Sequence, residues 1–138
     1  MEIDCDEFYP YREETEKILG CVFAVSNSMG YGFLESVYQK CLEIELRDAQ
    51  IPFESQKELA VYYKGENLGL KFKADIIVDN TIILELKAKD RIKTEDEAQI
   101  IHYLKATGYP LGLLINFGHK RRVEYKRFIN SDSSLLTK

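Results

Sequence analysis

The sequence has few cysteines, and their spacing excludes most of the sites that cysteines build. It contains three, Cys5, Cys21 and Cys41, which is an odd number without a CxxC pair. Zinc sites and disulfide frameworks need closely spaced or evenly numbered cysteines, so neither is expected. We expect small buried thiols in a reducing compartment, which indicates a cytoplasmic protein.

The chain also lacks a long apolar run and a strong excess of either charge. No stretch approaches the roughly 20 apolar residues of a membrane-spanning helix, and the acidic start MEIDCDEFYP is unlike a secretory signal. The formal net charge of -4 does not suggest a general polyanion binder, although local lysines or a metal could still attract phosphate. The sequence has no internal repeat, GxSxG nucleophile motif or phosphate loop.

The hydrophobic pattern predicts an α/β fold with a mixed sheet flanked by helices. Helical periodicity covers residues 11–28, 34–49 and 94–107, and extended runs cover 54–63, 68–78, 81–88, 111–117 and 121–129. Antiparallel hairpins would join the first three strands, and a right-handed crossover through the third helix would lead to the fourth. We expect Thr94 to cap the third helix, with Glu97 completing a capping box.

The length of 138 residues fits one domain. We expect its core over about residues 11–130, with loose ends at 1–10 and 131–138.

Two runs rich in Ile, Val and Leu, separated by Asp-Asn, predict a β-hairpin over residues 72–89. A three-residue loop pairs Val78 with Ile82 and places Asp75 opposite Glu85, with Asn80 in the left-handed conformation. One face then carries Ala74, Ile76, Val78, Ile82, Leu84 and Leu86, and the other carries Lys73, Asp75, Ile77, Ile83, Glu85 and Lys87. A strict two-residue loop would instead mix charged and apolar side chains on each face.

The charged face of this hairpin carries Asp75, Glu85 and Lys87, which are costly to bury unless paired or bound to a metal. Two carboxylates can hold Mg²⁺ together with waters and a substrate phosphate. Lys87 points the same way as Glu85 and could orient a metal-activated water or stabilise negative charge. Lys73 and Lys89 would add positive charge at the ends of the face. A structural ion-pair cluster would use the same residues, and the short D…ExK spacing alone favours that simpler interpretation.

Two helices could contribute further polar groups. Glu35 lies at the margin of a buried stripe, one turn before Tyr38, so its carboxylate could face the protein. Gln99 and Tyr103 are four residues apart and share one side of the third helix. They could line a site, or they could simply hydrogen-bond each other.

Taken together, these motifs resemble the PD-(D/E)XK nuclease superfamily. Asp75 followed by Glu85-Leu86-Lys87 is similar to its metal-binding motif, although Ala74 stands where proline is often found. GFLESVY at residues 32–38 resembles the GxxExxY pattern that names a bacterial and archaeal branch. The resemblance extends through YYKGENLG, the EAQ…YLKATG helix and LGLLINFG, over roughly residues 12–130.

The resemblance implies a restriction-endonuclease-like fold and metal-dependent hydrolysis of phosphodiester bonds. It assigns Mg²⁺ or Mn²⁺ to Asp75 and Glu85, with Glu35 and the backbone carbonyl of Leu86 as further ligands. It gives Lys87 a catalytic role. Gln99 and Tyr103 resemble a Q-x-x-x-Y signature on a helix that lines the active site of helicase-associated members.

The expected partner is nucleic acid, with DNA favoured over RNA, and a homodimer or protein partner could supply specificity. One alternative is a non-catalytic nucleic-acid or protein binding module that keeps the fold. Another is a structural domain that dimerises through a sheet edge or through a patch of Tyr9, Tyr11, Tyr62 and Tyr63.

Overall fold

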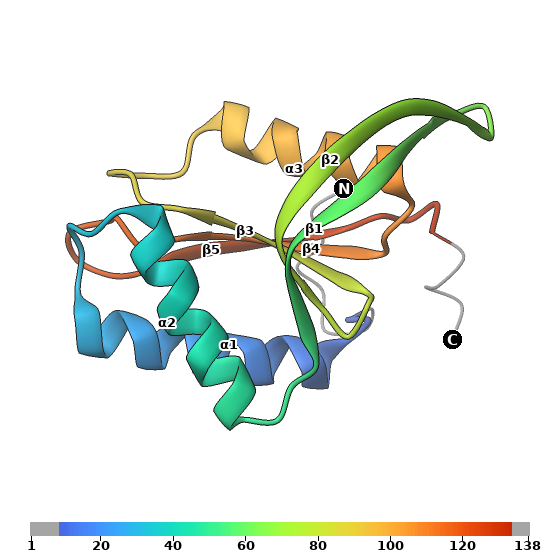
Figure 1. The fold of residues 1–138 in the computed structure, drawn as a ribbon. Helices are drawn as coiled ribbons and strands as arrows, with labels where there is room; N and C mark the ends of the chain where they lie inside the picture. Colours follow the sequence, from blue (N-terminus) through green and yellow to red (C-terminus); the bar gives the residue numbers. More distant parts are fainter. Residues whose placement is uncertain (1–8, 134–138) are drawn as a thin grey trace.

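The computed structural model describes residues 9–133, which form a five-stranded mixed sheet with helices on both faces (Figure 1). The elements are α1 (Arg12–Met29), α2 (Glu35–Asp48), β1 (Phe53–Tyr63), β2 (Glu66–Val78), β3 (Ile82–Lys87), α3 (Thr94–Thr107), β4 (Leu111–Asn116) and β5 (Glu124–Ile129). Every boundary lies within three residues of its expected place, and the α/β restriction-endonuclease-like fold class is confirmed.

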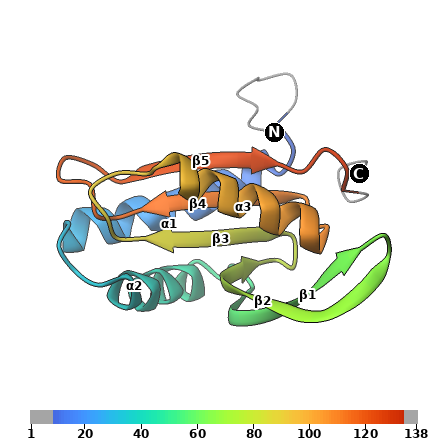
Figure 2. The same cartoon turned by 90° about the horizontal axis from the view of Figure 1, so that it is seen from above.

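The strands lie in the order β1-β2-β3-β4-β5, and only β3 and β4 are parallel among the described pairs. α3 makes the crossover between them, so the carboxyl ends of β3 and β4 lie at the same edge of the sheet (Figure 2). Gly112 permits the close packing of this crossover, because a Cβ there would lie 2.8 Å from the Ile100 side chain. α3 therefore fixes where the end of β3 lies.

Two apolar clusters cover the two faces of the sheet. Ile82, Leu84 and Leu86 point toward α1 and α2, whereas Ile83 and Leu114 point toward α3. β4 is buried along its whole length because helices cover both of its faces, which explains the unbroken apolar run in its sequence.

The register of the β2–β3 hairpin confirms the prediction. Val78 pairs with Ile82, and the Thr81 N–H donates to the Val78 carbonyl at 3.0 Å. Asn80 adopts the left-handed conformation with φ 53°, and Asp79 shares it with φ 51°.

The prediction for Ala74 is wrong. Its side chain packs with Phe72 and Ile77 beneath α3, and not with Ile76 toward α1 and α2. Ala74 pairs with Lys57 of β1, and the neighbouring Gln56 has φ 52°, which distorts the ribbon at this point. The twist rotates the strand about its axis, so alternate residues on either side of the distortion meet different clusters.

The β1–β2 hairpin continues as a two-stranded ribbon beyond the rest of the sheet (Figures 1 and 2). Within the described chain, β3 pairs with β2 only over residues 76–78. Tyr62 and Tyr63 lie exposed near the end of this ribbon. Tyr9 instead lies beneath the Arg127 guanidinium, 3.7 Å from its ring centre, and Tyr11 packs against the core, so the four tyrosines have separate surroundings.

The expected loose ends lie mostly outside the described residues, as does Cys5. In the described part of the tail, Ser133 is buried and its N–H donates to the Asn130 carbonyl at 3.0 Å. Cys21 is buried, as expected, whereas Cys41 is only half-buried, and both are free thiols. No described helix has the length and apolar character to cross a membrane.

Candidate active site

A groove of about 730 Å³ lies between the β1–β2 ribbon, the end of β3 and α3. The structure brings together in it all seven residues singled out from the sequence: Glu35, Asp75, Glu85, Leu86, Lys87, Gln99 and Tyr103. His102 is exposed and also lines the groove. Lys71 and Lys73 of β2 line it too.

Asp75 is fixed where the hydrogen-bonded ladder between β2 and β3 stops. Its Oδ2 accepts a hydrogen bond from the Leu86 N–H at 2.8 Å, which takes the place of a ladder bond. Burial raises the pKa of the Asp75 carboxyl, while the Leu86 N–H and the Lys87 charge oppose that rise. The aspartate is therefore held against the strand that carries Glu85 and Lys87.

Glu85 is the most strongly perturbed carboxyl of the groove. It is only 7% exposed, and burial, followed by the charge of Asp75, raises its pKa to about 8. Within the described chain its buried Oε1 has no hydrogen-bond partner. An unpartnered buried carboxylate oxygen is costly, so the site suits a group that brings positive charge.

The backbone of β3 adds an oxygen to this pair. The N–H and C=O of one strand residue point to the same edge of the strand. The Leu86 N–H faces Asp75, so the Leu86 carbonyl also faces the β2 side, whereas the Lys87 carbonyl accepts from the Phe117 N–H at 2.9 Å. Two carboxylates and one carbonyl are a ligand set that fits Mg²⁺, which completes its shell with waters and phosphate.

Glu35 lines the same groove but does not form a three-carboxylate cluster with Asp75 and Glu85 in the described chain. Among residues 9–133, no group of three or more His, Cys, Asp and Glu side chains is close enough to hold a metal ion. Glu35 is exposed at the first residue of α2, and burial raises the pKa of its carboxyl while the Lys87 charge lowers it. The charges of Lys87 and Asp75 therefore act on the Glu35 carboxylate, although it does not complete a three-carboxylate metal site.

The GxxExxY segment is held by its tyrosine. Tyr38 is fully buried and stacks on Phe117 with ring centres 4.7 Å apart. Its hydroxyl donates to the Gly30 carbonyl at 2.6 Å and accepts from the Phe33 N–H at 3.2 Å. Tyr38 thus fixes the loop that leads into Glu35.

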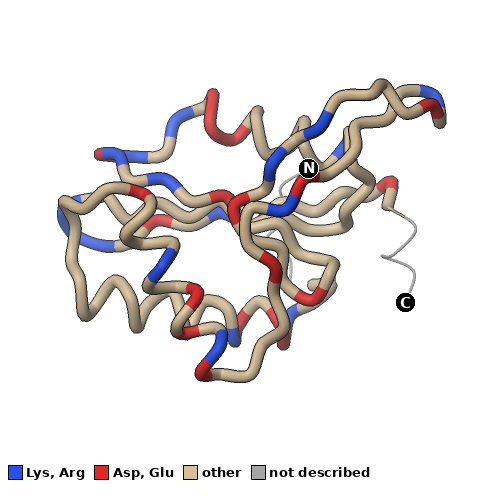
Figure 3. Tube along the Cα trace, in the orientation of Figure 1, with Lys and Arg blue, Asp and Glu red and all other residues tan. Residues whose placement is uncertain are grey.

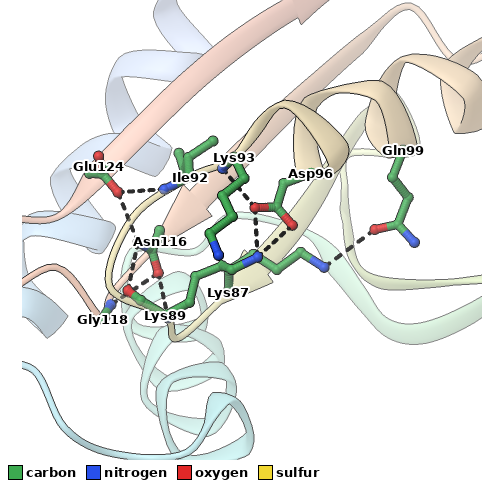
Figure 4. A network of polar contacts seen from close by, with 9 residues as sticks. All are labelled: Lys87, Lys89, Ile92, Lys93, Asp96, Gln99, Asn116, Gly118 and Glu124. Atoms are coloured by element: carbon green, nitrogen blue, oxygen red, sulfur yellow. Dashed lines mark hydrogen bonds and ion pairs between the residues drawn. The ribbon is translucent and has the colours of Figure 1, made fainter.

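A chain of polar contacts connects β3 to α3. The Lys87 Nζ donates to the Gln99 Oε1 at 3.3 Å, and the Gln99 Nε2 donates to the Tyr103 hydroxyl at 2.8 Å (Figure 4 shows the first contact). The Tyr103 ring stacks on Phe72 of β2. Gln99 and Tyr103 therefore hydrogen-bond each other and also line the groove, so the two alternatives considered for them from the sequence are compatible with each other.

The start of α3 differs from the prediction. Lys93 occupies the N-cap position, and its N–H donates to the Asp96 Oδ2 at 2.9 Å. The predicted capping pair of Thr94 and Glu97 is therefore wrong. The N-cap lies one residue earlier than predicted, so Asp96 and not Glu97 is at the third helical position and accepts from the N-cap backbone. The Lys89 Nζ also contacts Asp96, at 2.9 and 3.0 Å, so the positive charge expected at this end of the face is paired with a carboxylate (Figure 4).

A residue that the sequence reasoning missed ties the segment after β3 to β4. Asn116 is fully buried: its Oδ1 accepts from the N–H groups of Lys89 and Gly118, and its Nδ2 donates to the Lys89 carbonyl and to Glu124 (Figure 4). A Cβ on Gly118 would lie 2.3 Å from the Lys89 backbone, so only glycine permits this approach. The available signal was an asparagine at the end of a buried apolar strand.

Comparisons with known proteins give the family and the fold of this chain. A family model described as the PD-(D/E)XK nuclease superfamily matches residues 12–128. The crystal structure of SSO0001 is similar, with a TM-score of 0.53 and 20% identity, over 91% of this chain and 63% of that one. This chain thus spans less than two thirds of that protein, and at this identity the likeness shows the fold alone. A search of curated proteins gave no significant match. The family match covers most of the chain, which therefore belongs to the PD-(D/E)XK nuclease superfamily.

Proposed function

We propose that this protein is a divalent-metal-dependent nuclease that hydrolyses phosphodiester bonds in nucleic acid. The observation that carries the proposal is the buried, unpartnered Oε1 of Glu85 beside the Asp75 carboxylate, with Lys87 on the same strand. Asp75, Glu85 and the Leu86 carbonyl would hold Mg²⁺ or Mn²⁺, and Glu35 would contribute through a water. When bound, such an ion lowers the pKa of a water and neutralises phosphate charge.

Lys87 is the proposed catalytic lysine. Its ammonium orients the attacking water or stabilises the negative charge that develops on the phosphate. Gln99 holds that ammonium from α3 through its Oε1, and Tyr103 in turn holds the Gln99 amide. Gln99 and Tyr103 are therefore positioning residues in this proposal. Lys71 and Lys73 would attract the phosphate backbone into the groove.

The test is cleavage of single- and double-stranded DNA and RNA with Mg²⁺, Mn²⁺ or a chelator. Lys87→Ala would be compared with wild type and with Lys105→Ala, a control at an exposed lysine of α3 that does not line the groove. We expect metal-dependent cleavage by wild type and by the control, and a loss of at least about a hundredfold in Lys87→Ala. Equal cleavage by all three proteins would refute the role of Lys87 and point to contamination. DNA is the substrate that we would test first.

One observation favours a second candidate, a binding module that keeps the nuclease fold. The described chain lacks three acidic side chains close enough to hold a metal ion by themselves. If the module reading is right, wild type and Lys87→Ala will bind nucleic acid equally in chelator, and neither will cut it with either metal. Calorimetric titration with Mn²⁺ would then show no binding that depends on Asp75 and Glu85.

A further inference from the structure

A second groove, of about 760 Å³, lies between the end of α1 and the loop from β4 to β5. It shares one end of the sheet with the active site, because β3 and β4 are parallel and both end there. Ile92 and Phe117, from the segments that follow these two strands, line it. The loop between α1 and α2 joins the two grooves, since Tyr31 of this loop lines the second and Glu35, the first residue of α2, lines the first.

The rim of the second groove is basic although the whole chain is acidic. Lys120, Arg121 and Arg122 are consecutive, exposed and line the groove, and no described carboxylate forms an ion pair with them. Figure 3 shows blue segments gathered at this end of the molecule, opposite the tip of the β1–β2 ribbon. The one carboxylate of the lining, Glu124, is engaged by the Ile92 N–H and by Asn116, both at 2.9 Å. The groove thus presents three cations to solvent.

Exposed aromatic rings lie beside these cations. Phe23, Tyr31 and Tyr125 line the groove with 40%, 54% and 45% of their surfaces exposed. Phe23 and Tyr125 meet edge to face with ring centres 6.0 Å apart, an arrangement in which one ring turns its edge to the other and keeps its faces for further contacts. Rings of this kind bind the faces of nucleobases, and neighbouring arginines bind the phosphates between them.

We propose that this groove binds single-stranded nucleic acid and holds the strand that extends from the active site. The identity of the polymer rests on the proposed nuclease function. A duplex hides its base faces inside the helix, so only an unpaired strand can stack on Tyr31 or Tyr125 while its phosphates reach Arg121 and Arg122. The loop before Glu35 gives that strand a short path around the end of the sheet, from the first groove to the second.

The experiment measures binding of labelled oligothymidylate, oligouridylate and a mixed-sequence duplex by fluorescence anisotropy, in chelator so that nothing is cut. The groove variants are Arg121→Gln/Arg122→Gln and Tyr31→Ala. The matched control, Lys17→Gln/Arg47→Gln, removes the same charge from exposed positions on α1 and α2 away from both grooves. Circular dichroism and thermal unfolding confirm that each variant folds.

Three results are expected. Tyr31→Ala weakens binding of the single strands about 5- to 150-fold, the loss of one stacked base. The double arginine variant weakens it as well and lowers the slope of log affinity against log salt by about 1.4, for two phosphate contacts. The control leaves both unchanged, and duplex binding does not respond to Tyr31→Ala. The relative affinities of the two single strands show whether DNA or RNA is preferred.

Unchanged single-strand affinity in both groove variants would overturn the proposal. So would equally tight binding of polyglutamate that ignores Tyr31→Ala, because the surface would then suit an acidic protein partner. Failure of the nuclease function is separate: a groove that binds single strands in a protein that never cuts refutes the nuclease alone. Metal-dependent cutting with no effect of the groove variants on binding refutes the groove alone.

Discussion

The pKa of Glu85 makes a prediction about stability that needs no substrate. A carboxyl whose pKa is raised by folding binds more protons in the folded state, so the free energy of unfolding falls as pH rises between the unfolded and folded values. For Glu85 these values are 4.5 and about 8. The difference corresponds to at most about 5 kcal/mol, of which roughly 3 kcal/mol should be lost between about pH 5 and about pH 8.

Glu85→Gln removes this titration while keeping the size of the side chain. Urea unfolding in chelator at several pH values should therefore show a steep loss of stability with rising pH in wild type and a shallower one in the variant. Adding Mn²⁺ near pH 8 should restore stability to wild type more than to Glu85→Gln, because the ion replaces the missing proton. Parallel pH profiles of the two proteins in chelator would refute the claim that burial raises the pKa of the Glu85 carboxyl.

Other predictions concern the contacts around the site, and urea unfolding checks each of them. Asn116→Asp should cost about 2–4 kcal/mol, because a carboxylate oxygen would face the Lys89 carbonyl and Glu124; an unchanged midpoint would contradict the geometry. Gly118→Ala should cost at least about 2 kcal/mol, since the new Cβ meets the Lys89 backbone. Glu97→Gln, which breaks a half-exposed pair with Lys126 at 2.9 Å, should cost no more than about 1 kcal/mol.

Local rules carried most of the fold prediction. The pairing of Val78 with Ile82 followed from side-chain alternation, because a slip of one residue would have placed Asp75 on the apolar face with Leu84. Side-chain alternation gave the wrong face for Ala74. The ribbon is twisted there by its partner strand β1, which the sequence of β2 alone does not reveal. The prediction of the α3 cap was wrong for a related reason. Asp96 bonds the Lys89 ammonium as well as the Lys93 N–H at the start of the helix, and the first contact depends on the tertiary fold.

The candidate site also contains residues that the sequence predicts and one that it does not. Asp75, Glu85 and Lys87 meet because a hairpin brings neighbours in sequence together. Asn116 could not be predicted as their support, since its partner Lys89 lies 27 residues away and is reached only through the parallel crossover.

Two features of the sequence kept us from predicting the basic groove. A net charge of -4 masked a local cluster, and the run at 120–122 was assigned partly to a strand. β5 begins only at Glu124, which leaves those side chains in a loop.

The β1–β2 ribbon has a mechanical consequence for the catalytic groove. Val61 and Leu70 form part of its wall, yet they lie where the ribbon has left the sheet and where only two strands hold each other. Leu59 and Phe72 are the buried residues that brace it against the α3 cluster. Amides beyond this brace should exchange with deuterium sooner than those of β4. We therefore expect the width of the opening to follow the bending of this two-stranded ribbon, and not the five-stranded sheet behind it.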